Sequence, residues 1–332
     1  MQPFRYRMNY QDIFNIKTED DFLKSAIETF RFQAENNSVY KKFISLLNID
    51  VSEVKQLHQI PFLPIQFFKT HKIVSTNASV KEIFYSSGTT GMQLSKHYVT
   101  DINCYKTSFT KGFESFYGNI KDYTILALLP NYLERKGSSL VFMINDLIVK
   151  TGIKESGFYL NNLDELAQTL KTLDKKGEKT LLIGVSFALL DLIEKHQFQL
   201  KNTIIMETGG MKGRRKEIIR EELHQILKNG FGVSKIHSEY GMTELLSQAY
   251  SQGNGVFTTP KWMKILIRDT EDALTIFPKN KTGGINVIDL ANKNSCSFIA
   301  TQDLGKKLTD IHFEILGRFD NSDIRGCNLM IE

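Results

Sequence analysis

Apolar residues recur at mainly helical intervals from Thr18 to about Leu47. They are Phe22, Leu23, Ile27, Phe30, Phe32, Tyr40, Phe43, Leu46 and Leu47. Thr18 is a suitable helix N-cap, and the acids at 19–21 suit the positive end of a helix dipole. The pattern predicts a helical N-terminal cap.

Residues 60–73 (IPFLPIQFFKTHKI) break this periodicity with two prolines and a dense aromatic cluster. Because proline lacks a backbone donor and disfavours a helix interior, we expect an extended connector packed on the core. A subdomain boundary near this segment would make residues 1–80 the cap and connector.

Strand-like and helix-like segments alternate from residue 81 to about residue 250. The strand-like runs EIFYSS, YTILALLP, TLLIGVSF and NTIIMETGG alternate with helical patterns such as LDELAQTLKTLDKK and KEIIREELHQILKNG. Short buried strands separated by helices predict an α/β fold with a doubly wound, mainly parallel sheet over residues 81–254. From residue 255 to 332, the runs KILIRD, ALTIFP, GGINVIDL and SCSFIATQDL predict a small β-rich subdomain followed by a tail.

Composition narrows the class of protein. The 332 residues are 41% hydrophobic and 24% charged, which suits a globular chain. There is no apolar signal region and no run of about 18 uninterrupted apolar residues, so we expect a cytoplasmic protein without a membrane span. The net charge of +5 is mild, and the basic run MKGRRKEIIREE leads straight into acids, so nucleic-acid binding has no support. Cys104, Cys296 and Cys327 lack metal-ligand or disulfide-framework spacing.

A loop rich in hydroxyls and glycines follows the strand-like EIF. Its residues are Ser86, Ser87, Gly88, Thr89, Thr90 and Gly91. Glycines let backbone amides turn toward an anion, and hydroxyls donate further hydrogen bonds to phosphate oxygens. Met92 and Gln93 follow in place of Lys-Ser/Thr, so this is not a Walker A loop. From the residues alone, a phosphate loop and an ordinary polar turn remain equal alternatives.

A second polar motif, YGMTE, begins at Tyr240 and Gly241 after the predicted strand VSKIH. Thr243 offers a hydroxyl to a phosphate, and Glu244 offers a hard oxygen ligand to Mg²⁺. The alternative is a helix N-cap with Glu in the first turn of TELLSQAY, and for this motif alone it is the stronger interpretation.

Two further motifs lie in the β-rich tail, TQDLG at residues 301–305 and GRFD at residues 317–320. Asp303 can accept hydrogen bonds from ribose hydroxyls, and Arg318 can donate to ribose or phosphate. Taken separately, both motifs are also common in turns.

The order SSGTTG, YGMTE, TQDLG and GRFD resembles the motif series of adenylate-forming enzymes, which include acyl-CoA synthetases, peptide-synthetase adenylation domains and luciferases. The resemblance covers residues 81–320. It implies ATP and Mg²⁺ as cofactors, a carboxylic acid as substrate and acyl-AMP as product. In it, all four motifs bind nucleotide, Thr243 and Glu244 are catalytic, and Glu244 ligates the metal. Gly209 and Gly210 stand where related enzymes shape the adenine and acyl pockets, with an ordinary strand-to-helix turn as the alternative.

Adenylate-forming enzymes usually continue into a small mobile domain that carries a lysine used in adenylation. Only twelve residues follow Asp320, so we expect this domain and its lysine to be absent. Lys96, His97 and His237 are the alternatives for stabilising the phosphate in the transition state.

The short length, residues 60–73 and the ending NSDIRGCNLMIE resemble the acyl-protein synthetases, the LuxE-like long-chain-fatty-acid–protein ligases of bacterial luminescence. This implies a fatty acid whose acyl group moves to a cysteine near the C-terminus, here Cys327, and then to a partner such as a reductase or carrier protein. A thiolate attacks the mixed anhydride of an acyl-adenylate readily, and Arg325 favours the thiolate. The alternative is that Cys327 is a small buried apolar residue, which is the role expected for Cys104 and Cys296.

Two other functions remain open. A small carboxylate-CoA ligase of the phenylacetate type would use coenzyme A without a covalent step. A non-catalytic nucleotide-binding protein would stabilise a reductase or carrier complex. Full turnover by a Cys327→Ala variant would favour the first, and nucleotide binding without carboxylate-dependent pyrophosphate release would favour the second.

Overall fold

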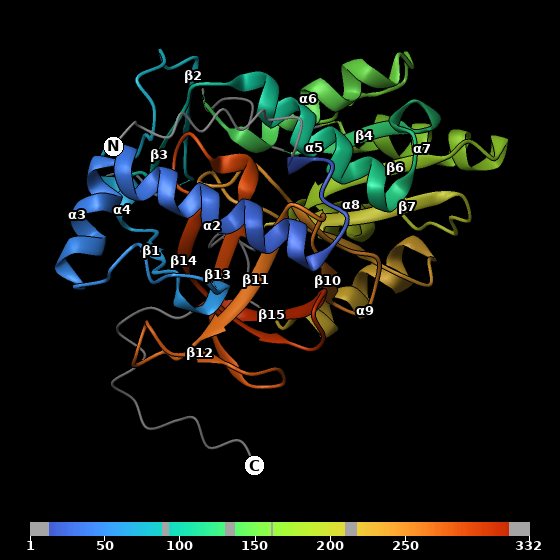
Figure 1. The fold of residues 1–332 in the computed structure, drawn as a ribbon. Coiled ribbons are helices and arrows are strands. Elements are labelled where there is room, and N and C mark those ends of the chain that lie inside the picture. Colours follow the sequence, from blue (N-terminus) through green and yellow to red (C-terminus); the bar gives the residue numbers. More distant parts are fainter. Residues whose placement is uncertain (1–12, 88–92, 130–136, 161, 210–217, 319–332) are drawn as a thin grey trace. The chain divides into compact units, whose positions relative to one another are not determined.

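The computed structural model describes residues 13–87, 93–129, 137–160, 162–209 and 218–318 (Figure 1). The chain divides into two compact units. One unit combines the two ends of the chain, residues 1–79 and 261–332, and the other is the continuous stretch 80–260. No sequence pattern had indicated that the two ends share a unit.

The predicted helical cap is confirmed as α2 (Glu19–Asn36) and α3 (Ser38–Leu46). The Thr18 hydroxyl accepts from the Asp21 backbone amide at 3.1 Å, and the Asp21 carboxylate accepts from the Thr18 amide at 3.0 Å. This reciprocal capping box fixes where α2 begins. Asn37 ends α2 and caps α3 by accepting from the Tyr40 amide.

The predicted extended connector at residues 60–73 is only partly extended. It contains the two-residue strand β1 (Leu63–Pro64) and the one-turn helix α4 (Phe67–Thr70), after the 3₁₀ turn η1 (Leu57–Gln59). Pro64 is tolerated in β1 because this short strand forms one parallel pairing, with β14, and needs few backbone donors.

The β-rich tail is confirmed as an antiparallel sheet in the order β12-β11-β13-β14-β15, with β1 parallel to β14. Its elements are β11 (Met263–Arg268), β12 (Ile276–Phe277), β13 (Thr282–Asp289), η3 (Leu290–Asn292), β14 (Phe298–Lys307) and β15 (His312–Arg318). Phe298 is fully buried and forms ring contacts with Phe30, Tyr40 and Phe62. This aromatic cluster joins the cap to the tail.

Residues 80–260 contain a sheet in the order β10-β9-β8-β7-β6-β4-β5 and a separate two-stranded hairpin, β2-β3. The strands are β2 (Glu82–Tyr85), β3 (Lys96–Val99), β4 (Thr124–Leu128), β5 (Gly157–Phe158), β6 (Thr180–Val185), β7 (Thr203–Thr208), β8 (His237–Tyr240), β9 (Ala249–Ser251) and β10 (Val256–Thr258). Strands β4 to β8 are parallel, and all of them except the short, half-buried edge strand β5 are buried at their centres, whereas β9 and β10 are antiparallel.

Helices lie on both sides of the parallel strands, with α5 and α6 above and α9 below them in Figure 1. They are α5 (Ile102–Tyr117), η2 (Ile120–Asp122), α6 (Ser139–Thr151), α7 (Leu163–Lys176), α8 (Ser186–Lys195) and α9 (Arg220–Phe231). The doubly wound, mainly parallel α/β fold is therefore confirmed. No helix in the described ranges is both long and apolar enough to cross a membrane.

Candidate functional site

The hydroxyl-rich loop joins β2 to β3, and paired serines close its stem. The Ser86 amide donates to the Ser95 carbonyl at 3.1 Å, and the Ser95 amide donates to the Ser86 hydroxyl at 2.9 Å. Ser87 is exposed beyond this closure, and Gly88, Thr89, Thr90 and Gly91 lie outside the described residues. The loop thus starts from a defined hairpin.

Thr243 of the YGMTE motif contacts both strands of this hairpin. Its hydroxyl donates to the Tyr85 carbonyl of β2 at 3.4 Å, and its carbonyl lies 2.8 Å from His97 Nδ1 of β3. A carbonyl only accepts, so Nδ1 of the buried His97 carries the proton. Two motifs far apart in the sequence are therefore neighbours, and His97, expected only as a possible source of charge, anchors Thr243.

Residues 241–248 contain a turn at 243–244 and no helix, so the helix N-cap interpretation of Thr243 is wrong. Tyr240 on β8 pairs with Ala249 on β9, and this antiparallel pairing ties both ends of the segment. The pairing places Ala249 and Tyr250, the last two residues of the expected helix, in β9, although TELLSQAY has helical periodicity. Glu244 is buried within the turn.

A buried carboxyl that the sequence did not single out, Glu239, lies at the end of β8. The Thr208 hydroxyl at the end of β7 donates to it at 2.5 Å. Burial, together with the nearby Glu207 carboxylate, raises the pKa of Glu239 to about 7, although the hydrogen bond from Thr208 acts to lower it. A Cβ on Gly241 would lie 2.5 Å from a Glu239 carboxyl oxygen, so any other residue at this position would displace that carboxyl group.

Gly209 follows β7 with a left-handed φ of 68°, and its carbonyl accepts from the Ser186 hydroxyl at 2.8 Å. It marks the exposed turn at the carboxyl end of the parallel sheet, next in sequence to Thr208. Gly210 lies outside the described residues.

Asp303 and Arg318 are cross-strand partners on β14 and β15. Arg318 Nε lies 3.3 Å from an Asp303 carboxylate oxygen, with the arginine exposed and the aspartate largely buried. The turn interpretation of TQDLG is wrong, because β14 contains the whole motif. The last two motifs thus form one ion-paired site on a β-ribbon.

The three residues considered for stabilising the phosphate differ in environment. Burial lowers the pKa of His237 to about 4, so its ring is neutral at pH 7, and it lies 3.2 Å from the Tyr117 hydroxyl. Lys96 is exposed on β3 at the stem of the loop. Among the described residues, no three His, Cys, Asp or Glu side chains gather as a metal site. The single carboxylate of Glu244 nevertheless fits Mg²⁺, which takes most of its ligands from phosphates and water in nucleotide sites.

Cys104 and Cys296 are buried, as expected for structural cysteines. Burial raises the pKa of Cys296 to about 12, so its thiol is a poor nucleophile. Cys327 and Arg325 lie outside the described residues.

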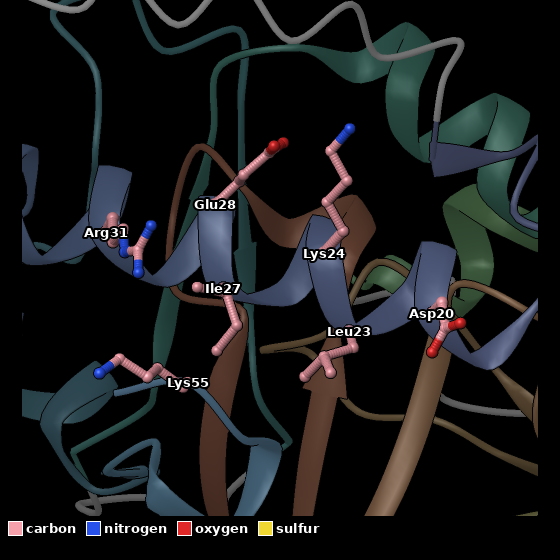
Figure 2. A pocket seen from close by; sticks show the side chains of 7 residues that line it. All are labelled: Asp20, Leu23, Lys24, Ile27, Glu28, Arg31 and Lys55. Carbon is pink, nitrogen blue, oxygen red and sulfur yellow. The ribbon is translucent and has the colours of Figure 1, made fainter. Parts of the chain in front are cut away.

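A groove of about 330 Å³ runs along α2 (Figure 2). It is open to solvent, and charged side chains surround a small apolar floor. Its lining residues are Asp20, Leu23, Lys24, Ile27, Glu28, Arg31 and Lys55. None of the candidate site residues lines this groove.

Two solved structures share the fold. The structure of 2-hydroxyisobutyryl-CoA ligase in complex with 2-HIB-AMP has a TM-score of 0.65 and 12% identity, covering 91% of this chain and 68% of that one. ATP-bound MatB from Rhodopseudomonas palustris has a TM-score of 0.56 and 16% identity, covering 74% and 49%. The chain thus matches about half the length of MatB. The fold is that of the adenylate-forming enzymes.

The sequence profile described as "Acyl-protein synthetase, LuxE" matches residues 13–332. The chain therefore belongs to the LuxE acyl-protein synthetase family. No curated protein sequence matches it significantly.

Proposed function

We propose that the protein acts in the cytoplasm, where it uses MgATP to convert a fatty acid into acyl-AMP and pyrophosphate and then transfers the acyl group to protein thiols. A carboxylate oxygen attacks the α-phosphorus and pyrophosphate leaves. The Cys327 thiolate then attacks the acyl carbonyl, AMP leaves, and a partner protein takes the acyl group by thioester exchange. Family membership supports this chemistry.

The observation that carries the proposal is the attachment of Thr243 to both strands of the β2–β3 hairpin. It brings a hydroxyl that suits a phosphate to the stem of the loop at residues 86–91. In this proposal that loop binds the phosphates, Glu244 holds Mg²⁺, and Tyr240 with Gly241 shapes the nucleotide pocket together with Gly209 and Gly210. Bound Mg²⁺ would neutralise phosphate charge.

Asp303 and Arg318 bind the ribose in this proposal. Asp303 is an acceptor already fixed by an ion pair, and hydroxyl groups of a ribose are donors. We assign the additional positive charge to Lys96, because His237 is neutral and His97 Nδ1 is engaged by Thr243.

Intact-protein mass spectrometry after incubation with MgATP and a panel of fatty and aromatic acids tests the proposal. Wild type should gain a hydroxylamine-labile acyl group, Cys327→Ala should not, and the matched control Cys104→Ala should behave as wild type. Pyrophosphate release without an adduct in any variant would instead indicate a diffusible acceptor such as coenzyme A. Nucleotide binding without pyrophosphate release would indicate a non-catalytic protein.

A further inference from the structure

Arg268 on β11 is a buried cation, only 7% exposed, with no role in the proposed chemistry. Its guanidinium donates to the Ile285 carbonyl at 2.9 Å, the Asn286 side-chain oxygen at 2.9 Å and the Thr301 carbonyl at 2.6 Å. A Cβ on Gly284, its partner on β13, would lie 2.5 Å from the guanidinium carbon. The guanidinium therefore lies against the backbone of Gly284.

The pairing of β13 with β14 changes register next to the Arg268 guanidinium. Gly284 pairs with Leu304 and Asn286 pairs with Ala300, so the three residues 301–303 of β14 lie opposite the single residue 285 of β13. Residues in a bulge lose ladder hydrogen bonds, and buried carbonyls then need other donors. Arg268 donates to one carbonyl on each of the two strands at this bulge, that of Ile285 on β13 and that of Thr301 on β14.

Asp303 is the last residue of the bulge. The Thr301 hydroxyl donates to the Ile285 carbonyl at 2.8 Å and accepts from the Asp303 amide at 3.1 Å. A change of one residue in strand register moves each side chain to the opposite face of the sheet. The direction of the Asp303 carboxylate therefore depends on the shape of the bulge.

The geometry points to Arg268 as a positioning residue that holds the bulge at residues 301–303, so that the Asp303 carboxylate faces the ribose of bound ATP. The planar guanidinium reaches three acceptors in fixed directions, which a lysine ammonium on a flexible stem does not reproduce. This inference rests on the proposed ribose-binding role of Asp303.

A double-mutant cycle on the full-length protein tests it. Isothermal titration calorimetry would give the ATP dissociation constants of wild type, Asp303→Asn, Arg268→Gln and the double variant. Each single substitution should weaken ATP binding about tenfold, the order expected for loss of a hydrogen bond to a charged group. The double variant should bind no more weakly than Asp303→Asn, because Arg268 acts through Asp303. Preference for ATP over 3′-deoxy-ATP and 2′-deoxy-ATP should fall in both single variants.

Lys264→Met is the matched control. Lys264 lies on the same strand, its side chain is 13% exposed, and it pairs with Glu19 and lies over the Phe22 ring, outside the bulge. Its loss should lower stability and leave the ATP dissociation constant and the deoxy-ATP preference unchanged. If Arg268→Gln does not fold, Gly284→Ala displaces the guanidinium without removing it and should give the same loss.

The inference would be overturned if the double variant lost as much ATP affinity as the two single variants together. An unchanged deoxy-ATP preference in Arg268→Gln would also overturn it. An unchanged preference in Asp303→Asn would overturn it too, by removing the ribose contact on which it depends. Pyrophosphate release and the Cys327 adduct are measured separately, so failure of the acyl-transfer chemistry is distinguishable from failure of this inference.

Discussion

Burial holds one residue near the carboxyl end of β8, Glu239, in an unusual charge state for a carboxyl group. Glu239 has a hydrogen-bond donor in Thr208 and a like-charged neighbour in Glu207. Glu207 is better partnered, since its carboxylate lies 3.7 Å from Arg220 Nε and 3.6 Å from His224 Nε2. Glu239 is therefore partly protonated near pH 7.

Glu239→Gln should make stability less dependent on pH. The folded-state pKa is raised, so the folded protein binds more protons than the unfolded chain between the usual value of 4.5 and about 7, and ionisation destabilises it as pH rises. The substitution should raise the free energy of unfolding by about 2 kcal/mol more at pH 8 than at pH 5. Urea unfolding at both values measures this, with the exposed Glu178→Gln as control. A gain that is equal at both pH values would refute the charge argument.

His97→Ala should slow pyrophosphate release roughly tenfold or more, because the half-buried carbonyl of Thr243 loses its donor and the threonine is no longer fixed to β3. Steady-state pyrophosphate assays with MgATP and a fatty acid measure the effect. His58→Ala, in an exposed position on η1, should have no effect. Wild-type rates in His97→Ala would show that the contact does not position Thr243.

At the scale of elements, one glutamine of α2 forms a network of buried hydrogen bonds with the tail. Gln33 Nε2 donates to the carbonyls of Asn292 and Lys293 at 3.2 and 2.7 Å, and the Ser297 amide donates back to its side-chain oxygen at 3.0 Å. Gln33 is fully buried. These groups have no access to water, so their pairing is needed for α2 to pack here.

Gln33→Leu should lower the free energy of unfolding by about 2–4 kcal/mol, because it leaves buried backbone groups unpaired while keeping the side-chain volume. Urea denaturation measures the loss. Asn36→Ala on the same helix removes an exposed hydrogen bond to the Phe32 carbonyl and should cost about 0.5 kcal/mol or less. Similar losses in the two variants would show that the Gln33 contacts do not stabilise the unit.

Elements with strong local signals were predictable from sequence. Thr18 and the acids after it located the start of α2, and the apolar runs located β4, β6 and β7. The prediction failed for residues 243–250, where helical periodicity yielded to the β8–β9 pairing. The strand predicted at VSKIH (residues 233–237) was also misplaced, since β8 begins only at His237. Tertiary pairing overrides local propensity in such short segments.

At the scale of the whole molecule, residues 1–79 and 261–332 pack together as one unit. The aromatic contacts of Phe30 and Tyr40 with Phe298, the Gln33 network and the pairing of β1 with β14 all join these two stretches. Residues 80–260 have their own sheet and helices.

A fragment of residues 80–260 should therefore fold alone, and a fragment of residues 1–79 should not unless residues 261–332 are added. Far-ultraviolet circular dichroism during a urea titration should show a cooperative transition for the fragment 80–260. It should show one as well for the mixture of the fragments 1–79 and 261–332. Cooperative unfolding of residues 1–79 alone, or none for residues 80–260, would contradict this division.

The sequence by itself determined the class of fold, the motif series and the starts of the strongly patterned elements, because these depend on local periodicity and on residue types at short spacing. Tertiary structure decided which side chains meet: His97 with Thr243, Asp303 with Arg318, and Arg268 with the bulge at residues 301–303. Such contacts depend on strand register and on bulges, and these are set by packing between segments that lie far apart in the chain.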